Sequence, residues 1–358
     1  MAGARGRRLL LDFALEAEEA RAVELGSDSL HYAVVRAARH LTSGRDDGRM
    51  TYRAGGGGAD DVWRAVVAPD EVAHRLFGMT LPDVTPVGLR SALAQAVDTA
   101  MYWEEPDGVD VLTATEPVRR ELQRVGEHLA RSPHSQWWTT PTVLPDQWSV
   151  WTWGDDSPDP DESTAAGRLR LWRERTLENE ERSTRDPGTS FSGWWSTPPT
   201  QSSTRLLSDG TPAGLWFVED SMGWERAVTR HVTISAGAKV YEIAGPQAWA
   251  ELCRRFPLEV TAQNGEDWRL TTGRSGRWVI PDWTRVAGDY AGLHLTAAGY
   301  LAAAGTVVDV DADTASVIAG WAPDETYWLT DAALVNGEVQ TWVRDTNSRH
   351  PVWAEQPQ

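Results

Sequence analysis

The sequence predicts an α+β protein, in which a helical N-terminal domain precedes a strand-rich domain built on a bent sheet. Apolar residues recur at helical spacing through the first 134 residues, whereas short β-branched and aromatic runs prevail from Trp194 onward. The tryptophans divide in the same way, because only Trp63 and Trp103 of the 20 belong to the first part. A chain of 358 residues is long enough for two domains, or for one large domain with an extension.

Residues 1–134 are expected to form a helical accessory domain. Its clearest helix covers Glu116–Arg131, with Thr115 available as a cap and Pro117 in the first turn. Four apolar residues of that helix share one face: Val118, Leu122, Val125 and Leu129. Further helices are expected over Ala14–Leu25, Asp28–Leu41, Pro69–Phe77 and Val87–Tyr102.

Residues 135–190 are expected to connect the two domains. They begin with a tryptophan-rich stretch and continue through the acidic, proline-containing run Gly154–Ser163. Such a run buries little apolar surface, so we expect a linker there. The stretch that follows, from Thr164 to Thr184, alternates in charge at helical spacing and predicts an exposed or bridging helix.

Residues 191–345 are expected to form the ligand-binding or catalytic domain, and residues 346–358 a tail. Pro246 and Pro281 each open a short amphipathic helix. Short strands are expected over residues 193–197, 213–219, 231–235, 239–244, 258–262, 277–281, 292–301, 306–310 and 314–321. Many short strands and the absence of a G-x-G-x-x-G motif favour a bent sheet over a parallel dinucleotide-binding sheet.

Charge and composition exclude several classes of protein. A net charge of −18 argues against non-specific affinity for nucleic acid or for an anionic membrane. No segment has the run of apolar residues that spans a bilayer, and the apolar start of the chain is interrupted at Asp12, unlike a signal peptide. We therefore expect no membrane partner and a cytoplasmic location.

Several kinds of chemistry are also excluded or disfavoured. The single cysteine, Cys253, rules out internal disulfides and is expected to pack on a helix face. The histidines form no zinc-binding pair, so no metal site is expected. Lys239 is the only lysine and lies in an expected strand. The alternating aspartates of Asp309–Gly320 lack the glycine and glutamate of a calcium loop and predict a turn between strands.

Two nearly identical heptapeptides, SQWWTTP from Ser135 and SGWWSTP from Ser192, each contain a tryptophan pair. If they are strands, adjacent side chains point to opposite faces, so one ring enters the core while the other lies beside hydroxyl groups. An outward ring of this kind suits stacking against a base, a nicotinamide or a sugar. Trp195 and Ser196 are therefore candidate ligand-binding residues, whereas Trp249 and Trp283 are expected in the core.

The order of motifs over about Ser192–Asp331 resembles that of a group of uncharacterised actinobacterial proteins. The motifs are PAGLWFVEDSMGWERA, AKVYEIAGPQAWAEL, WVIPDWTRVAGDYAGLHLT and AGWAPDETYWL. They are more distantly similar to phage- and toxin-associated domains of the ADP-ribosyltransferase type. This resemblance implies a cleft between two small bent sheets that holds NAD, and a role in a toxin or phage-conflict system.

The resemblance also implies roles for particular residues. Arg205 would hold the ribose or phosphate of NAD, and Trp216 would support the nicotinamide. Such domains carry a glutamate near their end that stabilises the positive charge on the ribose, but the segment AGLHLT has His294 and Thr296 where we expect it. Glu219 is therefore the first candidate for the catalytic carboxylate.

Three further residues are predicted to act at the same site. His294 is the second catalytic candidate, because imidazole titrates in the range that acid–base chemistry uses. Tyr300 belongs to the hydroxyl-bearing segment that follows it. Arg274 lies in a glycine-flanked turn and could meet a diphosphate, although a surface hairpin is the simpler interpretation.

Three functions stay open at this point. The first is an NAD-dependent ADP-ribosyltransferase or NAD glycohydrolase that uses NAD as its substrate and a protein or nucleic acid as its acceptor. The second is a non-catalytic binding protein whose aromatic cleft holds a nucleotide, a glycan or a peptide. The third is an enzyme of natural-product synthesis.

Overall fold

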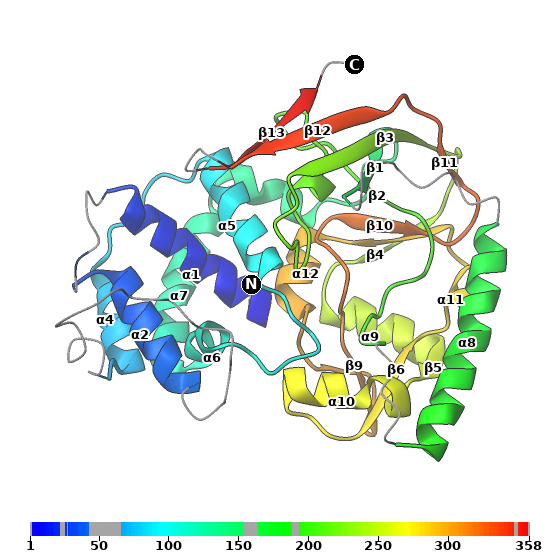
Figure 1. The fold of residues 1–358 in the computed structure, drawn as a ribbon, viewed down its shortest axis with the longest axis horizontal. Coiled ribbons are helices and arrows are strands. Elements are labelled where there is room, and N and C mark those ends of the chain that lie inside the picture. Colours follow the sequence, from blue (N-terminus) through cyan, green and yellow to red (C-terminus); the bar gives the residue numbers. More distant parts are fainter. Residues whose placement is uncertain are drawn as a thin grey trace.

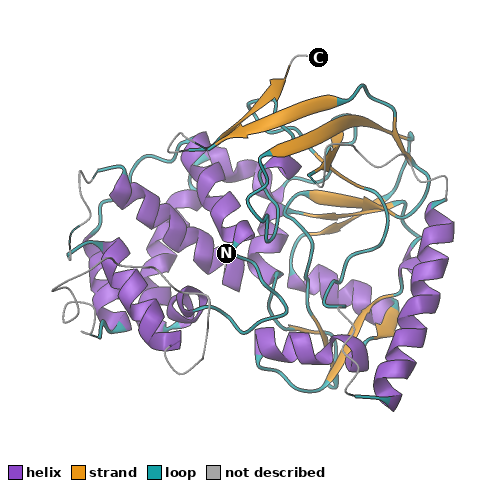
Figure 2. Ribbon diagram, in the orientation of Figure 1, coloured by secondary structure: helices purple, strands orange, loops and turns teal. Residues whose placement is uncertain are grey.

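The computed structural model describes residues 2–21, 26, 28–42, 66–152, 164–187, 193–346 and 350–356. Helices from the N-terminal third form one side of the molecule, and two sheets with further helices form the other (Figures 1 and 2). This arrangement of N-terminal helices followed by a mixed sheet confirms the expected fold class at that level. The expected acidic linker, Gly154–Ser163, lies outside the described residues.

The helical part contains six described α-helices and a 3₁₀ helix. They are α1 (Ala4–Glu19), α2 (Leu30–Thr42), α4 (Pro69–Gly78), α5 (Pro86–Asp98), α6 (Gly108–Ala114), α7 (Glu116–Ala130) and η1 (Pro133–Thr139). The four apolar residues predicted on one face of α7 are all buried. Helix α1 begins ten residues earlier than predicted, because its charged residues are neutralised in the interior. Arg5 pairs with Asp110, and Arg8 pairs with Asp12 and Asp107.

Among the described residues the larger sheet has nine strands. Eight follow the order β13-β12-β3-β1-β2-β10-β7-β4, and β11 also pairs with β3. All neighbours are antiparallel except β4 and β7. Their bounds are β1 (Gln147–Trp151), β2 (Ser202–Thr204), β3 (Arg226–Ile234), β4 (Val240–Ile243), β7 (Gly292–Leu295), β10 (Glu325–Trp328), β11 (Ala333–Val335), β12 (Gln340–Asp345) and β13 (Val352–Gln356). Strand β13 lies in the segment predicted to be a tail.

The smaller sheet has the order β5-β6-β9-β8 and is accompanied by helices on the same side of the molecule. Its strands are β5 (Pro257–Glu259), β6 (Arg277–Pro281), β8 (Val308–Asp309) and β9 (Thr314–Ser316). The accompanying helices are α8 (Ala165–Arg185), α9 (Pro246–Arg255), α10 (Thr261–Thr272), α11 (Trp283–Val286) and α12 (Ala297–Ala303). Strands β8 and β9 pair antiparallel, which confirms the turn predicted in Asp309–Gly320.

The strand predicted over residues 292–301 is wrong in its second half, because residues 297–301 belong to α12, which Thr296 caps by accepting from the backbone N–H of Gly299. Two more predicted strands are wrong altogether, and both concern tryptophans. Residues 213–219 form the 3₁₀ helix η2 (Ala213–Leu215) and a turn, and residues 193–197 are extended but pair with no named strand. Trp137 and Trp138 lie in η1, where successive side chains are about 120° apart rather than on opposite faces. The alternation argument for the tryptophan pairs therefore fails. Trp194 and Trp195 instead stack on one another, with ring centroids 4.5 Å apart.

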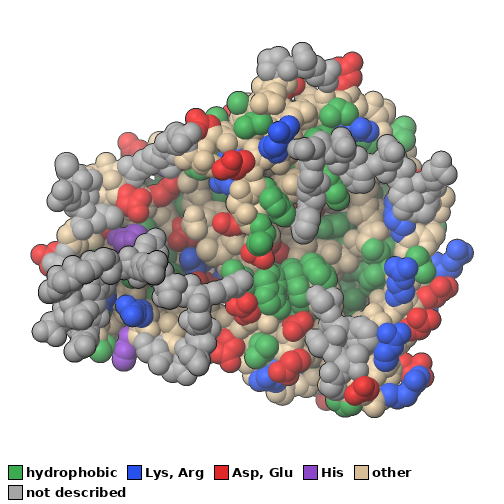
Figure 3. Space-filling model, in the orientation of Figure 1, with side chains coloured by type: hydrophobic (Ala, Val, Ile, Leu, Met, Phe, Trp, Pro, Cys, Tyr) green, Lys and Arg blue, Asp and Glu red, His purple; other side chains and the backbone are tan. Residues whose placement is uncertain are grey.

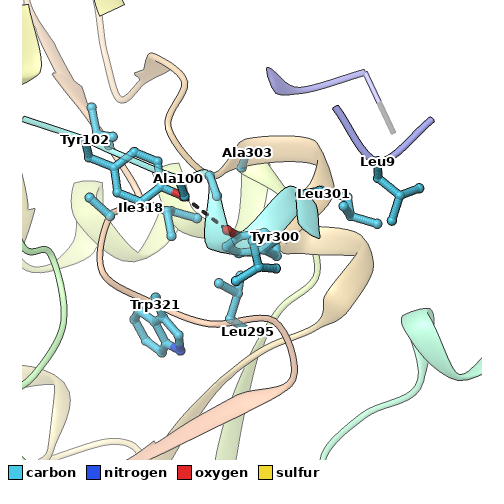
Figure 4. Packing of buried hydrophobic residues seen from close by; sticks show 14 of the residues in the cluster. Leu9, Ala100, Tyr102, Leu295, Tyr300, Leu301, Ala303, Ile318 and Trp321 are labelled. Atoms are coloured by element: carbon cyan, nitrogen blue, oxygen red, sulfur yellow. Dashed lines mark hydrogen bonds between the residues drawn. The ribbon is translucent and has the colours of Figure 1, made fainter. Parts of the chain in front are cut away.

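The helical part, the smaller sheet and strands β4 and β7 of the larger sheet share one hydrophobic core, and a second, small cluster contains Leu215, Ala227, Trp342 and Trp353. A single cluster of buried residues runs from Leu9 on α1 to Leu329 after β10. Figure 4 shows Leu9 of α1 close to Leu301 and Tyr300 of α12. Trp249 and Trp283 are completely buried, as predicted, and Cys253 is buried beside them on α9. The N-terminal helices are therefore part of the structural support of the sheets.

A close approach of backbones sets the position of α6 against α2. A Cβ atom on Gly108 would overlap the carbonyl oxygen of Ala38, whereas a Cβ on Gly78 would meet nothing within 4 Å.

We expect Gly108→Ala to lower the free energy of unfolding by about 1–3 kcal/mol, because one of two packed backbones must move. Urea denaturation measures this change. Gly78→Ala is the control and should stay within about 0.5 kcal/mol of the parent protein. Equal stability of the two variants would contradict the packing of α6 on α2.

Candidate functional site

Glu219 lies between the helical part and the sheets, where two tyrosines hold it. The hydroxyl of Tyr102, which follows α5, donates to Oε1 of Glu219 at 2.6 Å, and that of Tyr300 on α12 donates to the same oxygen at 2.9 Å. The two hydroxyl oxygens are 3.3 Å apart, as the dashed line in Figure 4 shows. The other oxygen, Oε2, is buried without a hydrogen-bond partner. These three residues form a polar contact inside the shared core.

The protonation state of this cluster follows from its burial. Burial raises the pKa of Glu219 to about 8, so the carboxyl group is mostly neutral at pH 7. Burial also raises the pKa of Tyr102 and Tyr300 well above the usual value, so both stay neutral. The structure thus brings the predicted residues Glu219 and Tyr300 into direct contact. In this position the Glu219 carboxyl group is mostly protonated at pH 7 and is packed in the core.

His294 and Arg205 meet in a second buried cluster, through Asp324. Nδ1 of His294 is 2.5 Å from Oε2 of Glu242, and its Nε2 is 3.3 Å from Oδ1 of Asp324. Nε of Arg205 donates to that same Oδ1 at 2.6 Å. Burial acts to lower the pKa of His294, but hydrogen bonds to Asp324 and Glu242 outweigh it and raise the pKa above the usual value. This network ties β2, β10, β7 and β4 together through charged side chains.

Asp324 has an unusual backbone conformation at the start of β10. Its φ of 66° lies in the left-handed region, which a non-glycine residue adopts at a cost of about 1–3 kcal/mol. The bonds to Arg205 and His294 offset that cost, and the backbone N–H of Asp324 donates to the carbonyl oxygen of Leu295 at 2.8 Å. The network therefore fixes where β10 begins, and with it the direction of the next side chain, Glu325.

A cleft of about 680 Å³ lies along the inner side of α8, and we name it the α8 cleft. Arg168, Trp172 and Arg175 line it from one face of α8, where residues four and three apart are neighbours. On the facing side lie the exposed ring of Trp195 and the buried side chain of Asn264. Figure 3 shows hydrophobic side chains gathered in a hollow near the centre of this face, to the left of α8.

Two polar contacts along α8 fix it against the residues around the smaller sheet. Nε of Arg173 pairs with Oδ2 of the buried Asp282 at 2.7 Å. Further along, the carboxylate of Glu180 accepts from the backbone N–H groups of Ala262 at 2.8 Å and Gln263 at 3.0 Å, in the first turn of α10. A carboxylate at a helix N-terminus is stabilised by the unpaired N–H groups there. The cleft wall is therefore attached at two points, to the residue that follows β6 and to α10.

The position of Trp195 depends on a glycine and on a serine. A Cβ on Gly320, whose φ is 73°, would overlap the Trp195 ring. Ser196 is fully buried and exchanges hydrogen bonds with the backbone of Ala319, which holds the segment against the strand that precedes Gly320. With Trp194 stacked on it, Trp195 is 47% exposed. The ring is thus held in place and still accessible.

A carboxyl group lies behind the wall of the α8 cleft. Thr197, which lines the cleft, acts on the pKa of Tyr327, and Tyr327 and Glu325 act on each other's pKa, so the three side chains lie near one another. Glu325 and Tyr327 are two residues apart on β10 and share one face of the sheet. Burial raises the pKa of Glu325 to about 7, and the backbone N–H of Ala322 donates to its Oε2 at 3.1 Å. Glu325 was not among the residues predicted from the sequence.

The other predicted residues lie elsewhere. Trp216 stacks on the guanidinium of Arg90, whose Cζ is 3.6 Å from the ring centroid, and donates from Nε1 to Thr211. Arg274 lies over Trp278 on the far side of α10, where it donates to backbone carbonyls. Neither residue lines the α8 cleft. Of the eight predicted residues, only Trp195 does.

The sequence contained a signal for the missed residues. Glu325 lies in the motif PDETYW, near the end of the region of resemblance, but the glutamate was expected earlier, in AGLHLT. The sequence did not indicate that one face of α8 lines a cleft, because the alternating charges of this helix predict an exposed or bridging helix. The described residues contain no group of acidic, histidine or cysteine side chains that could hold a metal ion. None of the described helices is both long and apolar enough to cross a membrane.

The buried carboxyl group of Glu219 predicts how stability depends on pH. Its pKa is higher in the folded state than in the unfolded chain, so the folded state retains a proton that the unfolded chain loses above about pH 4.5. Stability should therefore fall as the pH rises from about 4.5 to 8, by about 1.4 kcal/mol per pH unit from this group. Glu219→Gln should remove that slope, as measured by urea denaturation at several pH values.

Two controls separate this effect from others. His294 also has a raised pKa, so its stabilising contribution is lost in the same direction above about pH 6.5 and should persist in Glu219→Gln. Glu178→Gln, an exposed change on α8, should keep the slope of the parent protein. Parallel profiles for Glu219→Gln and the parent would show that Glu219 is ionised in the folded state.

Comparisons of the chain with protein-family models, with curated proteins and with solved structures found no match. The arrangement of side chains in the α8 cleft therefore carries the functional assignment.

Proposed function

We propose that the protein binds NAD in the α8 cleft and cleaves the bond between nicotinamide and ribose. The ADP-ribosyl group would pass to a protein or nucleic-acid acceptor, or to water. The observation that carries this proposal is the exposed Trp195 ring, which lines the same cleft as two arginines, with the carboxyl group of Glu325 behind the wall near Thr197 and Tyr327.

The cleft matches the chemistry of a dinucleotide. A flat ring stacks on an exposed tryptophan, and guanidinium groups suit the charges of a diphosphate. Arg168 and Arg175 supply two such groups although the whole chain carries a net charge of −18. Asn264 and Gln263 add amide groups that can hydrogen-bond with a ring edge or a ribose. A volume of about 680 Å³ lies within the usual range of small-molecule sites.

Glu325 suits the chemical step better than Glu219. When the C–N bond breaks, the electron pair leaves with neutral nicotinamide and positive charge develops on the ribose. A nearby carboxylate lowers the barrier by stabilising that charge. With a pKa of about 7, Glu325 is partly ionised at neutral pH, whereas Glu219 is mostly protonated and enclosed by tyrosines. The acceptor or water then attacks the ribose carbon and loses a proton.

A second function is favoured by one observation. No carboxylate side chain is among the described residues that line the α8 cleft itself. If a ligand stays on the Trp195 side of the wall, the protein binds a nucleotide without cleaving it. Binding and turnover therefore have to be measured separately.

The binding step is tested by calorimetry with NAD and ADP-ribose. Trp195→Ala should weaken binding about tenfold or more, because stacking contributes about 1–3 kcal/mol. Arg175→Gln should weaken it as well, since a diphosphate loses a charged partner. Arg170→Gln is the matched control, because Arg170 is exposed on α8 and does not line the cleft. If Arg170→Gln weakens binding as much as Arg175→Gln, the effect is general electrostatics and the cleft is not the site.

The chemical step is tested by measuring nicotinamide release from NAD. Glu325→Gln should abolish release while NAD affinity changes little, because the carboxylate acts mainly on the charge that develops during cleavage. The rate in the parent protein should rise with pH through about 7 as Glu325 ionises. Unchanged turnover in Glu325→Gln would exclude this residue. NAD binding without release by the parent protein would select the binding function.

A further inference from the structure

Two neighbouring amide side chains of α10 line the α8 cleft, and the fold uses only one of them. The amide nitrogen of Gln263 donates to the carbonyl oxygen of Thr176 at 3.1 Å and to Glu180 at 3.3 Å, so it holds α10 against α8. Asn264 is only 2% exposed, yet its carboxamide forms no hydrogen bond within the part of the chain that the structure describes. Asn264 is therefore a buried amide whose hydrogen-bonding capacity the fold leaves unused.

The carboxamide of Asn264 opens to the cleft. Some unpaired polar atoms of this protein, such as Oε2 of Glu219, are sealed from solvent, but the amide nitrogen and oxygen of Asn264 are not. Because the side chain lines the cleft, the small exposed area of this residue lies there. A buried polar group normally has a hydrogen-bond partner. Here a molecule in the cleft is the partner that can supply those bonds.

Asn264 faces the segment that carries Trp195. Trp268 lies one turn further along α10, and its Nε1 donates to the carbonyl oxygen of Trp194 at 2.9 Å. Residues four apart share one face of a helix, so Asn264 lies on the face of α10 that contacts this segment. Asn264 and Trp195 both line the cleft. A flat ring that stacks on Trp195 can thus present its edge to the Asn264 carboxamide.

The stability of the fold does not explain an asparagine at this position. Asparagine has a lower helix propensity than alanine, and burying an amide costs free energy when no group in the protein pairs with it. Departures of this kind from local consistency are expected at functional sites, where a residue serves a ligand rather than the fold. The two observations, an unpaired buried amide and an exposed ring beside it, meet in one corner of the α8 cleft.

We propose that Asn264 selects the ring that stacks on Trp195, by pairing with a ring edge that carries an N–H donor beside an acceptor. A carboxamide offers the complementary acceptor and donor, and two-point pairs of this kind discriminate between rings. That the ring belongs to NAD rests on the proposed function. Both ends of NAD carry such an edge, which is the amino group and adjacent ring nitrogen in adenine and the carboxamide in nicotinamide.

The test is calorimetric titration of the full chain with NAD and two analogues. The etheno-adenine analogue blocks the amino group and adjacent nitrogen of adenine, and the acetylpyridine analogue has a methyl ketone in place of the nicotinamide carboxamide. We expect the parent protein to bind one analogue at least about fivefold more weakly than NAD, because the pair with Asn264 is broken. Asn264→Ala should weaken NAD binding by a similar factor and bind NAD and that analogue equally. The analogue that loses affinity identifies the end of NAD that Asn264 contacts.

Glu266→Ala is the control, because Glu266 is exposed on the same helix and does not line the cleft. It should keep the affinity and the selectivity of the parent protein. The melting temperature of Asn264→Ala should not fall, since the fold makes no hydrogen bond to this amide. If it does fall, Asn264→Leu takes its place, because leucine is of similar size and its side chain cannot form hydrogen bonds.

Equal binding of NAD and both analogues by the parent protein, unchanged selectivity in Asn264→Ala, or a lack of NAD binding would each overturn the role of Asn264. Nicotinamide release measured on the same samples separates this role from the proposed cleavage. Selective binding without release supports the role of Asn264 and contradicts cleavage. Release with full NAD affinity in Asn264→Ala contradicts only the role of Asn264.

Discussion

The ion pair between Arg205 and Asp324 is the interaction on which the larger sheet depends. It joins β2 to β10, and through His294 it reaches β7 and Glu242 on β4. Removing one partner would leave a charge buried without compensation, which typically costs several kcal/mol. The same pair stabilises the left-handed backbone of Asp324 and so determines the direction of Glu325. Arg205 and His294 were predicted to bind or act on a ligand. In the structure they instead help to fix the position of Glu325, whose carboxyl group faces the other side of the sheet.

Several tryptophan rings of this chain stack against arginine guanidinium groups. Only one of its 34 basic residues is a lysine, and the flat guanidinium groups of the others can pair with carboxylates and stack on rings at the same time. Arg90 does both, between Asp209 and Trp216. Six tryptophans among the described residues are completely or almost completely buried, which fills the space between two sheets and the surrounding helices. Among the tryptophans that the structure describes, Trp195 is the exposed exception.

The polar contact of Glu219 with Tyr102 and Tyr300 couples the helical part to the sheets. Because the carboxyl group is neutral and hydrogen-bonded, it can lie in a shared apolar core without an ion partner. The N-terminal helices therefore hold α12, and so the adjoining sheet, from behind.

The sequence by itself determined the elements that local periodicity specifies. Helix α7, helix α8, the helix opened by Pro246 and strands such as β4 and β6 all lie where apolar spacing and capping residues place them. It also determined the core positions of Trp249 and Trp283, because their helices are short and amphipathic. Only the tertiary structure decided which residues meet. Glu219 became part of a buried contact with two tyrosines. The charged face of α8 came to line a cleft, and Glu325 came to lie behind the opposite wall without lining it. The physical reason is that burial and pairing set the charge and accessibility of a side chain, and both depend on residues distant in the chain.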